Sequence, residues 1–455
     1  MKNFLIAIAA MVAFTAGPLT ALGQQQTGSA ADALSLNHAI TLALENNRNA
    51  RNAKLEVEKA GDRVAQLRTR RLPGLKLNSL ISQPLSTFET RFEQGVFGTY
   101  QGIGPVPAET TSISSSTKTT ALMVAQVTQP LTQLRRIGLQ IKQQEVGLEI
   151  SQADLHATEQ AIVNDVKHAY YAILQTQGAS VAAEESVKLY RELDRVTAEY
   201  VMQQVALKTD QMDVQTRMAK AEYQVLTLTN QLSLQKEQLN LLLGRDVTTE
   251  FTVSDPLDAA QVMMRETSLT EARQRALAHR PEMRMAQLQV QKANLDRRAK
   301  KSEFIPDVSL TYNYISTFNY SNFVPRSVSS LGLQVEWEVF DWGRKKREVS
   351  EKAHAVSQAS NSLLETESQI VMEVNDRFRH VQEACQQIRI AKLAQTQANA
   401  NVQMATYKYR LDAVLLKDVL QAQTSRAEAN YDYQKALLAF WAAKADFEKA
   451  LGEDK

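Results

Sequence analysis

The sequence has few residues that interrupt regular structure. It contains 16 glycines and 10 prolines in 455 residues, about half the share of each that soluble proteins usually have. So few turn-forming residues indicate long uninterrupted elements, which disfavours enzyme folds that alternate many short strands, helices and loops. The single cysteine, Cys385, excludes an intramolecular disulfide framework and a cysteine-based zinc site.

An excess of charge and the common catalytic motifs are also missing. The 52 Lys and Arg residues nearly balance the 50 Asp and Glu residues, for a formal net charge of +2, so no overall field attracts nucleic acid. The six histidines form no H-E-x-x-H pair, and no P-loop or G-x-S-x-G frame is present. We therefore expect no enzymatic activity, no cofactor, no metal site and no nucleic-acid partner.

Residues 1–23 have the pattern of a secretory signal peptide. Lys2 supplies a positive start, an apolar run follows over 4–14, and small residues precede an expected cleavage ahead of Gln24. This run is too short to favour a membrane anchor, and no later apolar stretch approaches the roughly 20 residues of a membrane-spanning helix. We expect an exported chain whose residues 24–34 form a linker.

The rest of the chain is duplicated. Shifted by 233 positions, residues 35–77 align with 268–310, and shifted by 208 positions, residues 205–244 align with 413–452. The difference between the shifts places 25 extra residues in the first copy, between Pro73 and Val127. The sequence therefore predicts a first structural repeat over 35–244, an inter-repeat linker over 245–267, a second repeat over 268–452 and a tail over 453–455.

Each copy changes its hydrophobic period in the same order. A helix is predicted over about 36–71, and Pro73 ends it, as Pro306 ends its counterpart. Alternating apolar and polar residues then predict a β-hairpin with two strands of 8 to 10 residues. On the apolar face of the second hairpin are Tyr312, Tyr314 and Trp337. These aromatics favour a lipid-facing barrel segment, although a half-exposed hairpin of a soluble domain has the same pattern.

Long helices follow each hairpin. Apolar residues at alternating spacings of three and four predict a helix over about 132–201, a turn, and a return helix that ends at Gly244. The second copy repeats this pattern and ends at Gly452. Helical hairpins of this length cannot bury their apolar seams alone, so we expect the other repeat and further protomers to cover them.

In this order of elements, the chain resembles the TolC-like outer-membrane efflux proteins. The resemblance covers about 35–452 and includes the segment 335–344 after the second hairpin and 418–423 after the second turn. It implies a mainly α homotrimer, in which long coiled-coil hairpins form a periplasmic α-barrel. Two β-hairpins per protomer would contribute to a shared 12-stranded β-barrel in the outer membrane of a Gram-negative bacterium. A periplasmic adaptor and an inner-membrane transporter would be its partners in efflux or type I secretion, and outer-membrane lipid would surround it.

The resemblance also suggests residues for the pore entrance. Asp418 matches an acidic ring that narrows the pore, and Tyr409, Thr209 and Asp210 match a closed-state latch. A second acid of the ring is replaced by Gln421, and an arginine of the latch is replaced by Val414. For Asp418 and Asp210, a solvated charge or a helix cap remains an alternative.

The family's turn glycines are replaced here by Gln204 and Asp412, where a positive φ would strain glutamine more than aspartate. Two other functions also remain open, a soluble periplasmic coiled-coil adaptor without a pore and a structural coiled coil at the cell surface. The substrate is not specified by the sequence.

Overall fold

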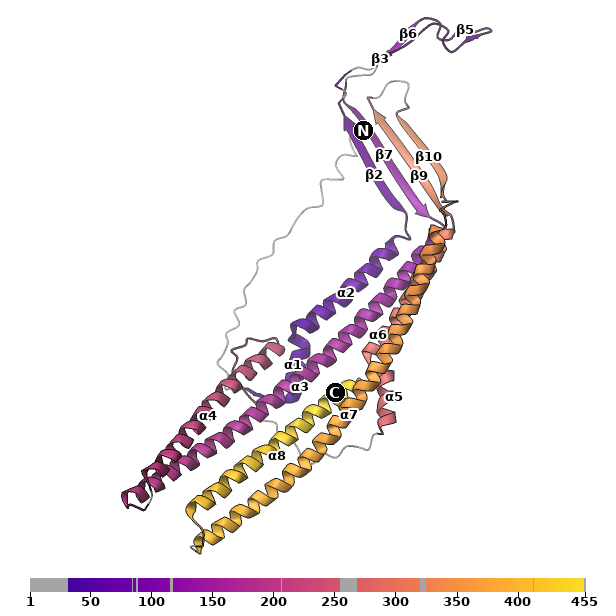
Figure 1. Cartoon of the computed structure of the whole chain (residues 1–455). Helices are drawn as coiled ribbons and strands as arrows, with labels where there is room; N and C mark the ends of the chain where they lie inside the picture. The colour runs from indigo at the N-terminus through magenta and orange to yellow at the C-terminus, as the bar shows by residue number, and fades with distance from the viewer. Residues whose placement is uncertain are drawn as a thin grey trace.

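A computed structural model describes residues 32–83, 85–86, 89–114, 118–205, 207–253, 268–319, 325–411 and 413–453. The predicted signal peptide and Asp412 lie outside these residues. The described chain has a sheet at one end and long helices that extend to two hairpin tips at the other (Figure 1). Within the described residues, no helix combines the length and the apolarity needed to cross a membrane.

The helices follow the predicted order in both halves of the chain. The longest, α3, spans Gln133–Met202, close to the predicted 132–201. Its 70 residues extend about 105 Å at a rise of 1.5 Å each. The others are α1 (Leu36–Asn46), α2 (Arg48–Thr69), α4 (Lys208–Leu242), α5 (Leu269–His279), α6 (Pro281–Lys301), η2 (Ser302–Phe304), α7 (Arg344–Arg410) and α8 (Leu416–Leu451).

Asn47 divides the first helix, so the expectation of one helix over 36–71 is wrong. Its ψ of 130° is extended, and its side-chain oxygen accepts hydrogen bonds from the N–H groups of Asn49 and Ala50. Its side-chain nitrogen donates to the carbonyl of Leu242 at 2.8 Å. Asn47 thus caps two helix ends at once, which offsets the interruption. Arg280 divides the second copy at the same place, ahead of Pro281.

The end of each return helix packs against this division. Gly244 has φ +68°, and a Cβ at this position would lie 2.2 Å from the carbonyl oxygen of Asn46. Gly452 has φ +76°, and its Cβ would lie 3.0 Å from the backbone nitrogen of Arg280. Both glycines therefore allow a left-handed conformation and a close backbone approach that a side chain would prevent.

The main sheet joins the two predicted hairpins. Its four antiparallel strands are arranged in the order β10–β9–β7–β2, so the inner strands of the two copies pair with each other. The strands are β2 (Gly74–Ser82), β7 (Thr120–Pro130), β9 (Asp307–Phe318) and β10 (Ser327–Glu336). No described strand pairs with the outer edges of β2 and β10, so a lone chain has two open edges.

Two smaller features were not expected from the sequence. Residues of both predicted linkers pair in parallel as β1 (Asp32–Leu34) and β8 (Phe251–Val253), which bury Leu34, Phe251 and Val253 against α3. The extra segment of the first copy is not a plain loop. It contains the paired short strands β3 (Glu89–Phe92) with β6 (Thr111–Ser114), and β4 (Thr99–Tyr100) with β5 (Gly104–Pro105).

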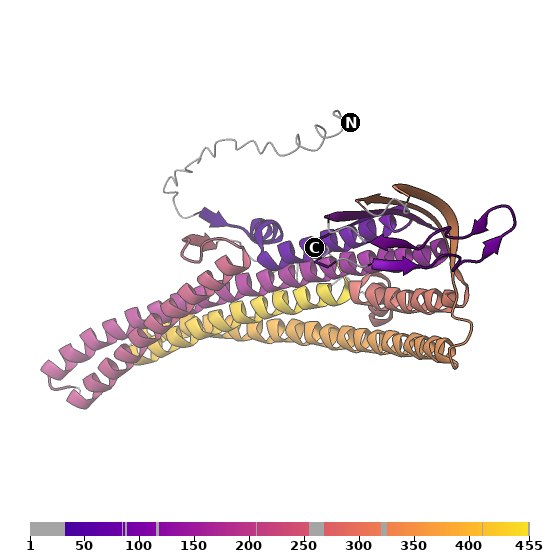
Figure 2. The same ribbon diagram turned by 90° about the horizontal axis from the view of Figure 1, so that it is seen from above.

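The two copies have separate cores that are joined along the helices. One core lies among α1, α3, α4 and the β1–β8 pair, and the other among α5, α7 and α8. The hairpins α3–α4 and α7–α8 run side by side, with α4 and α7 at opposite edges of the helical layer (Figure 2).

Candidate functional site

The main sheet has one apolar and one polar face. Register places Leu331 opposite Tyr312, and Tyr312 opposite Val127. Because side chains alternate along each strand, these residues share a face. The neighbouring positions on the same face continue the apolar surface across all four strands, and they include Leu75, Leu77, Ile81, Met123, Ala125, Val308, Leu310, Tyr314, Leu333 and Val335.

This apolar face is uncovered in a single chain. Leu331 is 70% exposed and Leu75 is 72% exposed, while Tyr312 is 43% exposed and Tyr314 is half-buried. The opposite face presents mostly polar side chains, among them Gln334 and Glu336. An exposed apolar surface of this extent requires another covering, either lipid or a protein.

Trp337 lies just outside the sheet, so the expectation that it belongs to a strand is wrong. Glu336, the last residue of β10, pairs with Asp307, and the next partner would be Pro306, which has no backbone N–H to donate. Trp337, Phe340 and Trp342 instead follow the strand at the junction with the helices, and they are 56, 70 and 87% exposed.

The two hairpin tips start their return helices in the same way. The Leu207 N–H donates to the Asp210 carboxylate at 3.2 Å, and the Leu415 N–H donates to the Asp418 carboxylate at 3.0 Å. In turn, the Asp210 and Asp418 N–H groups donate to the carbonyls of Leu207 and Leu415. Both aspartates are thus exposed helix caps with a second carboxylate oxygen outside these bonds. This geometry agrees with the helix-cap alternative and leaves a pore role for Asp418 as a hypothesis.

The other tip residues are placed as follows. Tyr409 lies in the last turn of α7, and its side chain is outside the described part of the chain. Thr209 is exposed in the first turn of α4. Gln204 has φ +61°, which confirms that this position needs a left-handed residue. Exposed apolar side chains surround both tips, namely Met202, Val205, Leu207, Leu411 and Leu415.

A polar cluster joins the two copies midway along the helices. Asp446 of α8 contacts the His168 Nε2 at 2.7 Å, accepts from the Asn164 side chain at 3.1 Å, and lies 3.5 Å from an Arg377 nitrogen. Burial alone would raise the pKa of the Asp446 carboxyl, but these hydrogen bonds and charges hold its pKa below the ordinary value. Ionised Asp446 therefore stabilises the contact between α3 and α8.

We expect Asp446→Asn to lower the free energy of unfolding by about 2 kcal/mol at pH 7. Because the folded-state pKa is lowered, the carboxylate stabilises the fold above the ordinary aspartate pKa of about 3.9, and this contribution is lost as pH falls further. Thermal unfolding at pH 7 and pH 3 measures the effect. The difference between wild type and variant should shrink at pH 3, and an unchanged difference would contradict this role of the charge.

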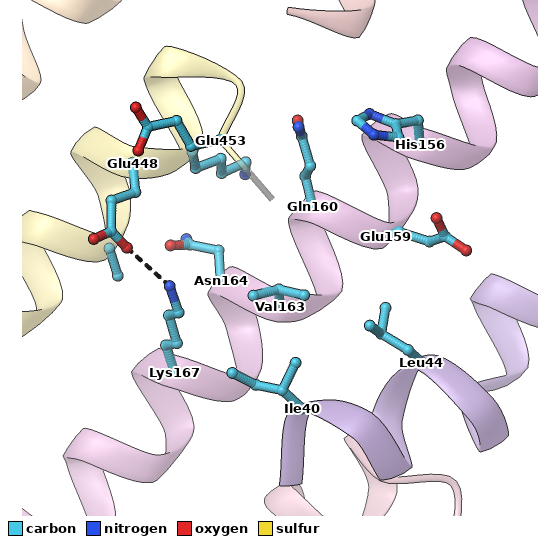
Figure 3. Close-up of a pocket in the computed structure, with 12 residues that line it drawn as sticks. Ile40, Leu44, His156, Glu159, Gln160, Val163, Asn164, Lys167, Glu448 and Glu453 are labelled. Carbon is cyan, nitrogen blue, oxygen red and sulfur yellow. Dashed lines mark hydrogen bonds and ion pairs between the residues drawn. The ribbon is translucent and has the colours of Figure 1, made fainter. Parts of the chain in front are cut away.

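A small pocket lies beside this cluster, between α1, α3 and α8 (Figure 3). Its volume is about 230 Å³. Ile40, Leu44 and Val163 form an apolar side, and Lys167 donates to Glu448 at 2.9 Å on the other side. The lining has no cysteine, serine or threonine that could act as a nucleophile. The ion pair between Lys167 and Glu448 joins α3 to α8 beside this pocket.

Metal and thiol chemistry also lack a site in the part of the chain that the structure describes. No group of three or more His, Cys, Asp or Glu side chains is placed to hold a metal ion there. Cys385 packs against the second core, and burial raises the pKa of its thiol, which disfavours the reactive thiolate.

Comparisons with known proteins agree with this architecture. No curated protein matches the sequence. Among solved structures, the chain is similar to CusC, with 17% identity, a TM-score of 0.74 and 92% of both chains covered. The CmeC outer membrane channel of Campylobacter jejuni has 14% identity and a TM-score of 0.72, over 92% of this chain and 85% of that one.

The open state of the MtrE outer membrane channel of Neisseria gonorrhoeae has 17% identity and a TM-score of 0.68, over 92% of this chain and 89% of that one. At such low identity, these likenesses show the fold. A family model described as outer membrane efflux protein matches residues 39–245 and 272–453, which is most of the sequence. The chain therefore belongs to the outer membrane efflux protein family.

Proposed function

We propose that three copies of this chain close into one duct, through which substrates cross the periplasm and the outer membrane without chemical change. The observation that carries the proposal is the amphipathic sheet with its two open edges. Unpaired backbone groups cannot remain exposed to hydrocarbon, where each costs several kcal/mol. Pairing between copies removes these edges and leaves the apolar face toward lipid.

Strand direction and length support closure by identical neighbours. Successive strands of the sheet are antiparallel, so β10 of one copy would meet β2 of the next in antiparallel pairing. These edge strands have 10 and 9 residues, and a membrane-spanning strand needs about 9 to 11. Three copies would supply the 12 strands that the family resemblance implies, with Tyr312 and Tyr314 facing lipid.

The helices also present surfaces that a neighbouring copy would cover. Exposed apolar residues lie on α4, including Tyr223 and Leu226, and on α7, including Ile390 and Leu393. Because α4 and α7 are at opposite edges of the helical layer, a ring of copies would bring these surfaces together (Figure 2). A soluble monomeric adaptor would leave both surfaces and the sheet face in water.

Membrane fractionation and planar-bilayer conductance test the duct together. We expect the full chain in the outer-membrane fraction, a trimer mass in detergent by light scattering, and stable conductance steps in bilayers. Recovery as a soluble monomer without conductance would overturn the proposal and favour the adaptor alternative.

Asp418 is the proposed pore constriction. Threefold symmetry would bring three copies of its free carboxylate oxygen together, and such a ring favours cations. We expect Asp418→Asn to reduce the ratio of cation to anion permeability about twofold to tenfold, because three negative charges are lost. Asp418→Glu keeps the charge and suits the capping position, so it is the matched control. Reversal potentials in a salt gradient measure selectivity, and unchanged selectivity in Asp418→Asn would remove Asp418 as the filter.

The tips are also the proposed docking surface for a periplasmic adaptor and an inner-membrane transporter. Their exposed apolar residues would be covered by such partners. We further propose that Tyr409 contacts Thr209 and Asp210 in a closed state. The Asp210 oxygen that is not engaged by Leu207 is free for this contact within the described chain.

A further inference from the structure

Six cations line one open groove at the junction between sheet and helices. The groove has a volume of about 730 Å³. Its lining residues come from the region where α2, α3 and α6 approach the sheet, and Figure 1 shows how these elements are arranged. All six side chains are exposed, and they come from three segments distant in sequence: Arg71, Arg135, Lys142, Arg297, Arg298 and Lys301. A chain with a net charge of +2 thus concentrates positive charge at one place.

These charges are not compensated within the described chain. The lining of the groove contains no acidic residue. None of the six cations has an ion-pair partner among the described residues, whereas nearby cations are paired, such as Arg68 with Glu145 at 2.7 Å and Arg136 with Asp307 at 2.8 Å. Exposed like charges at this density repel one another. An anionic ligand would relieve this repulsion.

The position of the groove indicates the source of the anion. Arg71 lies two residues before Pro73 and three before the start of β2, and Lys301 is the last residue of α6, shortly before β9. The groove is therefore at the same height as the helix end of the apolar sheet face. Trp337 and Trp342 lie exposed at this junction as well. Aromatic and basic residues together are typical of the boundary between hydrocarbon and headgroups.

We propose that this groove binds the phosphate of an anionic glycerophospholipid headgroup in the periplasmic leaflet. The inference rests on the proposed function, since it needs the sheet to lie in the membrane. Guanidinium groups from α3, α6 and the segment after α2 match the oxygens of a phosphate in forked pairs, and the lysines add point charges. Gly138 leaves room at the groove for Arg71, whose guanidinium lies 3.2 Å from where a Cβ would be. All the groove residues belong to one chain, so the site is complete in each protomer.

The test is lipid binding to the full-length protein in detergent, measured by native mass spectrometry with phosphatidylglycerol as the probe. The variant is Arg297→Ser with Arg298→Ser and Lys301→Ser, all exposed. Each cation near an anionic headgroup raises the affinity about fivefold, so removal of three cations should weaken lipid binding roughly 100-fold. The matched control removes three exposed cations far from the groove that lack ion-pair partners in the described chain, Arg48, Arg426 and Lys435. Its affinity should stay within about twofold of wild type.

Two further probes separate the possible sources of phosphate. Phosphatidylcholine, which has no net charge, should bind at least tenfold more weakly than phosphatidylglycerol, and inorganic phosphate should not displace the lipid at equal concentration. Equal affinity of wild type and groove variant for phosphatidylglycerol would overturn the inference. So would displacement by inorganic phosphate, which would indicate a site for soluble anions.

Conductance distinguishes failure of this inference from failure of the duct. Wild-type pores that form in bilayers but show no phosphatidylglycerol preference in binding would overturn the lipid site alone. A chain that forms no pores in any bilayer would overturn the proposed function and the lipid site with it.

Discussion

Leu331→Arg should prevent assembly into the outer membrane. Leu331 is 70% exposed in the single chain, and in an ordinary soluble protein an arginine at such a position changes stability little. On the lipid face of a barrel strand, the same substitution costs about 2 to 4 kcal/mol near the middle of the bilayer. Because all three copies carry the change, the trimer is destabilised by this amount three times. We expect the loss of the trimer from the outer-membrane fraction.

Ser330→Arg is the matched control for this prediction. Ser330 is also exposed and adjacent, but it pairs with Asn313 on the polar face. This variant should assemble and conduct like wild type apart from a modest change in ion selectivity. Heat-resistant trimer in outer-membrane extracts measures both variants. Equal assembly of the two would show that the apolar face does not contact lipid and would favour a soluble coiled-coil function.

Gly244→Ala should destabilise the first copy by about 2 to 5 kcal/mol. Its φ of +68° disfavours a side chain, by about 1 to 2 kcal/mol. The added Cβ would also lie 2.2 Å from the Asn46 carbonyl oxygen, and relieving such an overlap of backbone atoms costs a further 1 to 3 kcal/mol or so. The shift would disturb the neighbouring cap that Asn47 provides to Leu242.

Alanine variants of two other glycines serve as comparisons for the loss of stability in Gly244→Ala. In Gly452→Ala, the added Cβ would lie 3.0 Å from its nearest atom. We therefore expect a smaller loss of unfolding free energy, about 2 to 3 kcal/mol. Gly61→Ala lies within α2 with nothing within 4 Å, and should gain up to about 1 kcal/mol from helix propensity. Denaturant unfolding of the purified variants measures the series. If Gly244→Ala behaves like Gly61→Ala, the close approach to Asn46 is not part of the native fold.

Local sequence signals were sufficient for most of the long elements. Heptad-like spacing places α3 within about one residue of its observed limits, because a 70-residue periodic segment leaves little ambiguity. Pro306 and the alternating residues likewise predict where β9 begins, but the strand has 12 residues and is longer than the 8 to 10 expected. The matching order of elements in the two copies followed from the duplication.

Features that depend on distant partners could not be predicted. Asn47 looks like an ordinary helical residue until Leu242, 195 positions away, supplies the carbonyl that its side chain binds. The β1–β8 pair similarly joins segments more than 200 residues apart. Short strands with two or three useful apolar residues carry too little local signal to be recognised.

The candidate sites show the same limit. Positions of Asp418 and Asp210 came from a family resemblance, and the structure adds their capping bonds. The cationic groove could not be recognised in the sequence, because its six cations come from three segments distant from one another. Arg71 lines the same groove as Arg297 and Lys301 only because α2 and α6 pack on either side of α3 in the folded chain.

The cluster around Asp446 has a mechanical consequence for the tips. It fastens α8 to α3, while Asp418 lies 28 positions earlier in the same helix, which corresponds to about 42 Å at 1.5 Å per residue. Between Asp418 and Asp446, α8 is one uninterrupted helix that also packs along α3 and α7. If this helix tilted by about 10° about the cluster, Asp418 would move sideways by roughly 7 Å. A change in the contacts of Asp446 with Asn164, His168 or Arg377 that tilted α8 would therefore displace the tip much farther than the cluster itself.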